Sequence, residues 1–107
     1  MAVPALTEAV FYILLSLLSP LHGYGIMQNA EKLSNGRIKL AAGTLYGALN
    51  TLLEKGWITA LSDTGSNDRK KEYVITEAGR EALRCEISRL EELIANGRRL
   101  LEGSDET

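Results

Sequence analysis

The chain has 107 residues, of which 45% are hydrophobic and 24% charged, and its formal net charge is −2. This length suits one domain with a single modest core, and the composition is that of an ordinary globular protein. A single cysteine, Cys85, excludes an intrachain disulfide and a thiolate metal cluster, which favours a reducing, cytoplasmic setting. The apolar stretch Phe11–Leu18 is too short to span a membrane and has no basic leader, so we expect a buried helix there and no membrane partner.

The charges are distributed unevenly along the chain. Residues 1–34 carry −1, residues 35–76 carry +2 and residues 77–107 carry −3. The middle third holds six basic residues, and three of them are adjacent at positions 69–71. A net charge near zero does not exclude a polyanionic partner when the basic groups share one face. Nucleic-acid binding therefore stays open for the middle third.

A first helix is predicted after Thr7, which is an N-cap candidate. Glu8 lies in its first turn, where the positive end of the helix dipole favours an acidic side chain. The helix is expected to run to about Leu18, because Ser19-Pro20 ends it.

A second helix is predicted from His22-Gly23 to about Leu33. The sequence Ser34-Asn35-Gly36 ends it, since Asn and Gly tolerate the left-handed conformation that follows many helices. Residues 37–40 then alternate polar and apolar, which predicts a short edge strand.

The stretch Gly43–Leu53 reads GTLYGALNTLL and predicts a third helix. Its four leucines fall at i, i+4, i+7 and i+8, so one face is marked for the core. The opposite face carries Thr44, Gly47 and Asn50, where an ordinary exposed helix would carry Lys and Glu. An interior glycine costs a helix about 0.5–1 kcal/mol. We therefore expect this small, neutral face to have a function.

Two strands and a long helix are predicted after Lys55-Gly56, which ends the third helix. Residues 57–61 and 70–75 read as short strands on either side of a polar loop, which is typical of a hairpin. Thr76 then caps a helix that is expected to run to about Leu101. The polar residues 103–107 are expected to form a disordered tail.

This order of elements predicts a winged helix-turn-helix. A lone two-stranded hairpin is marginal in water, so the hairpin must lie against the helices. We expect a mainly α chain with a small β-hairpin wing, in which residues 1–76 form a DNA-binding domain and residues 77–102 a C-terminal dimerisation helix.

The third helix of such a fold is presented to the major groove of DNA. Small residues let its backbone approach the duplex, Thr44 and Asn50 can exchange hydrogen bonds with bases, and Tyr46 can reach a phosphate or a sugar. Tyr46 could equally pack in the core, and the cations at 69–71 could be a solvated surface instead of a phosphate contact in the wing. The predicted DNA-binding residues are Tyr24, Ala42, Gly43, Thr44, Tyr46, Gly47, Asn50, Arg69, Lys70 and Lys71.

The last helix carries an apolar stripe that continues to its end. A helix of some 25 residues spans about 37 Å, more than a domain of this size can cover, so part of the stripe needs another chain. The alternative is that the helix folds back on its own domain. The predicted interface of a homodimer comprises Phe11, Leu14, Leu18, Leu83, Ile87, Leu90, Ile94 and Leu101.

Four motifs resemble those of PadR-type transcriptional regulators: HGYGI at 22–26, GTLYGAL at 43–49, EKGWI at 54–58 and DRKKEYVITEAG at 68–79. Their order and spacing agree, over roughly residues 6–95. The resemblance implies a dimeric winged-helix repressor with one C-terminal helix, a near-palindromic operator and release by a small, often aromatic, effector. The chain departs from the pattern at Ala41-Ala42, where members often have a capping Ser or a Pro, and at Gly47, where many have Pro.

Catalytic motifs are not found in the sequence. It contains no glycine-rich phosphate loop or nucleophile pair, and the single histidine, His22, has no partner at metal-ligand spacing, so we expect no enzyme, cofactor or metal. Cys85 is expected to be inert, and Trp57 to lie in the core or to line an effector pocket with the first-helix aromatics. A winged helix that binds a protein instead of DNA is the alternative function, which the neutral helix face and the wing cations disfavour.

Overall fold

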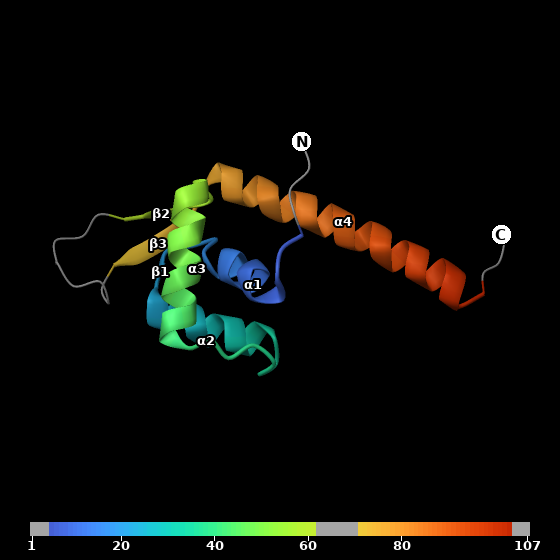
Figure 1. Cartoon of the computed structure of the whole chain (residues 1–107), viewed down its shortest axis with the longest axis horizontal. Helices are drawn as coiled ribbons and strands as arrows, with labels where there is room; N and C mark the ends of the chain where they lie inside the picture. The colour runs from blue at the N-terminus through green and yellow to red at the C-terminus, as the bar shows by residue number, and fades with distance from the viewer. Residues whose placement is uncertain (1–4, 62–70, 104–107) are drawn as a thin grey trace.

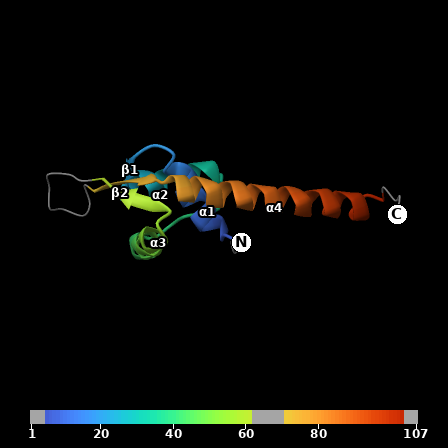
Figure 2. The same ribbon diagram turned by 90° about the horizontal axis from the view of Figure 1, so that it is seen from above.

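The computed structural model describes residues 5–61 and 71–103. The elements in chain order are α1 (Glu8–Ser16), β1 (Leu21–His22), α2 (Gly23–Leu33), α3 (Ala42–Lys55), β2 (Ile58–Ala60), β3 (Glu72–Ile75) and α4 (Glu77–Leu101). Helix α1 lies between α2 and α4, and α4 extends far beyond the other elements (Figure 1). Figure 2 shows α3 nearly end-on at one side of the molecule. The fold is therefore a small helical body with one presented helix and one long projecting helix.

The helix boundaries confirm the local signals in the sequence. The side-chain oxygens of Thr7 and Thr76 accept hydrogen bonds from the amides of Val10 and Gly79, both at 3.1 Å, and so cap α1 and α4. Gly56 ends α3 with a φ of 77°, in the left-handed region that favours glycine. Helix α1 ends at Ser16, two residues before the predicted end.

The core is built from one face of each of the first three helices, the inner face of the sheet and Leu83 at the start of α4. The leucine face of α3 is part of it, as the periodicity predicted. The buried hydrophobic cluster comprises Ile13, Leu14, Leu17, Ile26, Leu45, Leu49, Leu52, Ile58, Tyr73, Ile75 and Leu83. Burial of these side chains on one side of α3 turns its small polar side outward.

The sheet is antiparallel with the strand order β1-β3-β2. The predicted hairpin is confirmed, since Ile58 pairs with Ile75 and Ala60 with Tyr73. The other edge of β3 pairs with β1, where Leu21 lies opposite Tyr73. A strand of two residues gives too short a pattern to be predicted.

The edge strand predicted at residues 37–40 is wrong. The amide of Ile38 donates to the hydroxyl of Ser34 at 2.8 Å, and the amide of Arg37 donates to the carbonyl of Ser34 at 3.1 Å. These backbone groups are satisfied by a turn and are not free for a ladder. Polar-apolar alternation over four residues also occurs in a turn in which every second side chain is half-buried, as Ile38 and Leu40 are here.

None of the described helices is both long enough and apolar enough to cross a bilayer. Of the predicted tail, Gly103 is described, and residues 104–107 lie outside the described range.

Candidate nucleic-acid interface

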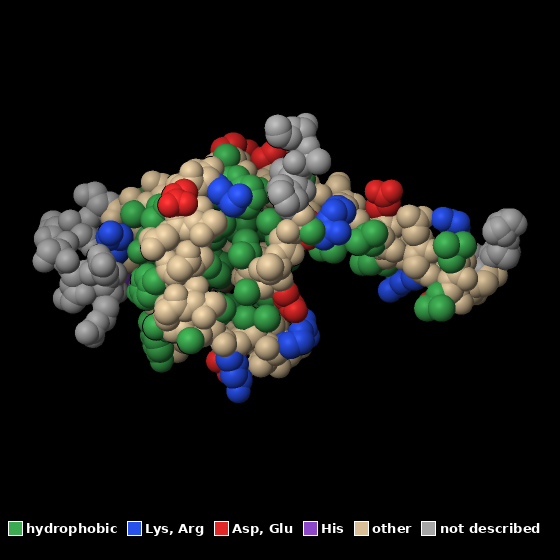
Figure 3. Space-filling view, in the orientation of Figure 1, with side chains coloured by type: hydrophobic (Ala, Val, Ile, Leu, Met, Phe, Trp, Pro, Cys, Tyr) green, Lys and Arg blue, Asp and Glu red, His purple; other side chains and the backbone are tan. Residues whose placement is uncertain are grey.

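The outward face of α3 is open to solvent, as the sequence predicted. Ala42, Gly43, Thr44, Gly47 and Asn50 are all exposed. Apart from the helix's own backbone, no described atom lies within 4 Å of the point where a Cβ on Gly43 or Gly47 would stand. Figure 3 shows most of α3 in tan, with one acidic and one basic patch at its C-terminal end. Its surface is therefore smooth, nearly uncharged and uncovered.

The N-terminus of α3 has no side-chain cap. Ala41 occupies the N-cap position and offers no side-chain acceptor, and the first turn contains no acidic residue. The first amides of a helix carry a partial positive charge and seek an acceptor. The departure at Ala41-Ala42 thus leaves amides that are suited to a phosphate oxygen.

Tyr46 packs at the crossing of α3 with α2, which favours the packing alternative for its ring. A Cβ on Gly23 would lie 2.3 Å from the Tyr46 hydroxyl oxygen and 2.9 Å from its Cζ, so glycine is what lets the ring lie there. Tyr46 is half-buried, and its contact with DNA stays a prediction. Gly23 is a positioning residue that the predicted set missed, although it is part of the HGYGI motif.

Tyr24 lies beside a basic residue that was not in the predicted set. Its side chain is 67% exposed at the start of α2. Tyr24 and Lys39 line one hollow of about 320 Å³ between α2 and the segment before α3. The charge count along the sequence included Lys39, but only the tertiary structure brings it beside Tyr24.

The wing is described only in part. Arg69 and Lys70 lie outside the described residues, so their predicted contacts stay predictions. Lys71 is half-buried directly before β3. On the neighbouring strands, His22 Nδ1 lies 3.8 Å from Glu72 Oε2.

Both ends of α3 are tied to other elements by polar contacts. Before α3, the Arg37 side chain donates from Nε to Glu8 of α1 at 2.9 Å, and this hydrogen bond raises the pKa of the Arg37 guanidinium. After α3, the hydroxyl of Thr76 donates to the carbonyl of Gly56 at 2.7 Å. These contacts tie the segment before α3 to α1 and the end of α3 to the start of α4.

The predicted dimer residues divide into two groups. Leu14 and Leu83 are only 0% and 5% exposed within the single chain, so they are core residues and offer no surface to a second subunit. This part of the prediction is wrong because the start of α4 does fold back, packing Leu83 on its own domain. Exposed apolar side chains continue along α4 to Ile94 and Leu101, which are 54% and 87% exposed. Phe11 and Leu90 are half-buried, and Leu18 and Ile87 are exposed.

A buried carboxylate between α4 and the N-terminal segment was not predicted. Glu86 is 4% exposed, accepts from Arg89 at 2.6 and 2.9 Å and accepts from the amide of Leu6 at 3.3 Å. The hydrogen bonds from Arg89, together with that from Leu6, hold the pKa of Glu86 below its ordinary value against the opposing effect of burial. This contact holds Leu6, just before α1, against α4.

A family model described as the transcriptional regulator PadR-like family matches residues 12–85. The chain belongs to this family. Among solved structures, this PadR-like chain is 28% identical to a PadR family regulator from Eggerthella lenta, with a TM-score of 0.71 over 88% of this chain and 81% of that one. It is 26% identical to the regulator TA0346 from Thermoplasma acidophilum, with a TM-score of 0.66 over 88% of this chain and 90% of that one. It is also 26% identical to RosR of H. salinarum, with a TM-score of 0.64 over 85% of this chain and 76% of that one. No curated protein sequence matches it.

Family membership makes the PadR-like chain a winged-helix transcriptional regulator and not an enzyme. Proteins of this type bind DNA, which agrees with the open face of α3. Within residues 5–61 and 71–103, no cluster of three or more His, Cys, Asp or Glu side chains is arranged to hold a metal.

Proposed function

We propose that this PadR-like regulator is a repressor that binds a near-palindromic operator as a homodimer. The observation that carries the proposal is the open, nearly uncharged face of α3. Thr44 and Asn50 read base edges, Gly43 and Gly47 admit the backbone of the helix to the groove, and the amides of Ala42 and its neighbours hold a phosphate.

Further contacts on the duplex come from both sides of α3. Tyr24 and Tyr46 contact the backbone beside the N-terminal end of the helix, with Lys39 as an additional cation. Arg69, Lys70 and Lys71 of the wing lie along the adjacent phosphates. These contacts supply affinity, whereas α3 supplies sequence preference.

The homodimer is supported by the second half of α4. This helix of 25 residues is about 37 Å long and runs past the body of the molecule (Figure 1). Leu93, Ile94, Leu100 and Leu101 are between 53% and 87% exposed along it. Covering such a stripe with a second copy creates two-fold symmetry, which sets two α3 helices about one DNA turn apart.

The proposed function includes release of the repressor from its operator by a small effector, which is often aromatic in the PadR-type regulators that the sequence resembles. The proposed setting is the cytoplasm.

The test is a gel-shift titration of the purified protein on the DNA upstream of its own gene. The triple replacement of Arg69, Lys70 and Lys71 by Ala is expected to weaken binding to every duplex and to reduce the slope of log affinity against log salt by roughly 2 to 3. Thr44→Ala and Asn50→Ala are expected to alter sequence preference by about 1–3 kcal/mol at one base pair.

A matched control is Lys32→Met, an exposed change on the outer side of α2 that is expected to leave both quantities unchanged. If the replacements in α3 and the wing leave duplex affinity at the wild-type value, the DNA interface is wrong. A winged helix that binds a protein partner would then be favoured.

A further inference from the structure

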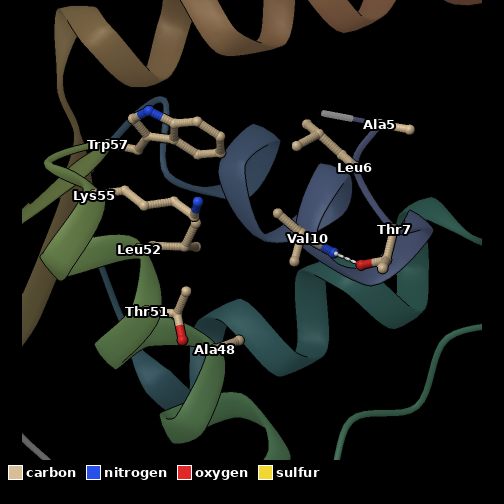
Figure 4. A pocket seen from close by; sticks show the side chains of 9 residues that line it. All are labelled: Ala5, Leu6, Thr7, Val10, Ala48, Thr51, Leu52, Lys55 and Trp57. Atoms are coloured by element: carbon tan, nitrogen blue, oxygen red, sulfur yellow. Dashed lines mark hydrogen bonds between the residues drawn. The ribbon is translucent and has the colours of Figure 1, made fainter. Parts of the chain in front are cut away.

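A hollow of about 260 Å³ lies between the N-terminal part of α1, the C-terminal half of α3 and the start of β2. Leu6 and Val10 on one side face Trp57, Lys55 and Leu52 on the other (Figure 4). A hollow of this size with apolar walls suits a small molecule, and its volume is too small for a helix. The hollow adjoins the face of α3 that is proposed to bind DNA, because Ala48 and Thr51 neighbour Gly47 and Asn50 along the helix.

The polar groups at the hollow are few, and most of them are engaged within their own helix. The Thr7 hydroxyl accepts from the Val10 amide, and the Thr51 hydroxyl donates to the carbonyl of Gly47 at 3.3 Å. The carbon edge of the indole of Trp57 points toward Leu6 in Figure 4. Among the described residues that line the hollow, Lys55 alone is charged.

The ammonium of Lys55 is positioned at the hollow by the aromatic ring beside it. Its Nζ lies 5.1 Å from the centre of the Trp57 ring, within the range of a cation–π contact. No described carboxylate lies within ion-pair distance of this ammonium. Its donors therefore remain available to an anion at the edge of an apolar cavity.

We propose that this hollow binds a small apolar monocarboxylate, with its hydrocarbon body between Val10 and Trp57 and its carboxylate on Lys55. A charge-assisted hydrogen bond at the edge of the cavity adds to burial of the hydrocarbon part. A cationic ligand of the same shape would be repelled by Lys55, and a neutral one would gain only the apolar contact. The hollow thus selects for charge as well as for shape.

Ligand binding here would act on the DNA-binding helix directly. Ala48, Thr51, Leu52 and Lys55 all belong to α3, so an occupant contacts the element that is proposed to enter the groove. The role of the hollow as an effector site rests on the proposed function, whereas the binding of a ligand there does not. Coupling between the two sites is reciprocal, so a ligand that alters duplex affinity is itself bound differently by the DNA complex.

Trp57 is the only tryptophan of the chain, so tryptophan fluorescence reports on the wall of this hollow. We would titrate the full chain with cyclohexanecarboxylate, cyclohexylmethanol and cyclohexylmethylamine, which share a body and differ in charge. The carboxylate is expected to bind about ten-fold more tightly than the alcohol, and the amine more weakly than both. Lys55→Met should abolish the preference for the carboxylate, and Lys32→Met should retain it.

Two results would overturn the proposal. One is a Trp57 emission that no probe changes, as would follow if a second copy of the chain filled the hollow. The other is equal affinity for the three probes in the wild-type chain. Ala48→Leu, which fills the hollow without removing the charge, should abolish the response to carboxylate and alcohol alike.

A gel shift with and without cyclohexanecarboxylate separates the site from its role. The ligand is expected to change duplex affinity at least about three-fold in the wild-type chain, and Lys55→Met should need about ten-fold more ligand for the same change. Binding without this change would overturn the effector role alone. Failure of the ligand-free protein to bind any duplex would overturn the proposed function and leave the fluorescence result standing.

Discussion

Replacing Gly47 with alanine is expected to make the protein more stable and a weaker binder of DNA. Gly47 lies in the interior of α3, and a Cβ there meets open space. Alanine in place of glycine at an exposed helix position gains about 0.8–1 kcal/mol, because the unfolded chain has less conformational freedom to lose. In a domain of this size, that gain corresponds to a rise in Tm of about 4–8 °C.

The same methyl group would stand on the face that is proposed to enter the major groove. If the backbone at Gly47 approaches the duplex closely, an added carbon forces α3 away from its contacts. Overpacking of a close-fitting surface typically costs about 1–3 kcal/mol, which is about 5- to 150-fold in affinity. Stability and affinity should therefore change in opposite directions.

The two quantities are measured by urea unfolding, followed by circular dichroism at one fixed protein concentration, and by gel-shift titration at one salt concentration. A more stable variant with affinity within two-fold of wild type would refute the close approach of Gly47 to DNA. A less stable variant would refute the openness of this face.

Gly79→Ala provides the matched control in α4. A Cβ on Gly79 would lie 2.2 Å from the carbonyl oxygen of Trp57 and 2.6 Å from Cγ1 of Ile75. A backbone carbonyl cannot move aside without disturbing the chain around it. The free energy of unfolding of this variant is therefore expected to fall by about 2 kcal/mol or more, although alanine is the better helix former. Comparison of Gly47→Ala with Gly79→Ala shows whether the surroundings of the new methyl group or helix propensity decides if the protein becomes more or less stable.

Three further predictions concern stability and assembly. Gly56→Ala places a side chain at a φ of 77° and is expected to lower the free energy of unfolding by about 1–2 kcal/mol, measured by urea denaturation; an unchanged midpoint would contradict the left-handed end of α3. Because the pKa of Glu86 is lowered in the folded chain, its stabilising effect is present above the ordinary glutamate pKa of about 4.3 and is lost as the pH falls through the folded value. Glu86→Gln is therefore expected to lower the Tm at pH 7 and to reduce its fall between pH 5 and pH 3, and parallel Tm curves for variant and wild type would contradict this. Replacing Ile94 and Leu101 together by Glu is expected to give a monomer in analytical ultracentrifugation, whereas Ser88→Glu on the same helix should leave the dimer; a dimer in both would place the interface elsewhere.

Local signals in the sequence were enough for the helices and the hairpin. Capping by Thr7 and Thr76 and the stop at Gly56 depend on residues at most four positions away, so their chemistry is visible in a short stretch of sequence. The open face of α3 was predictable for the same reason, because helical periodicity alone separates Leu45 and its row from Thr44 and Asn50. The side of α3 that is proposed to face DNA was thus set by residues that are neighbours along one helix.

The tertiary structure decided which partner each apolar or polar group has. The apolar stripe on α4 indicates that its side chains pack against another element. Only the tertiary structure shows that Leu83 packs in the core of its own chain while Leu101 stays exposed. The placement of the Tyr46 ring over Gly23 and the contact of Glu86 with Leu6, 80 positions away, leave no local pattern at all. Periodicity records that a side chain is buried, whereas the identity of its neighbour depends on how distant segments pack.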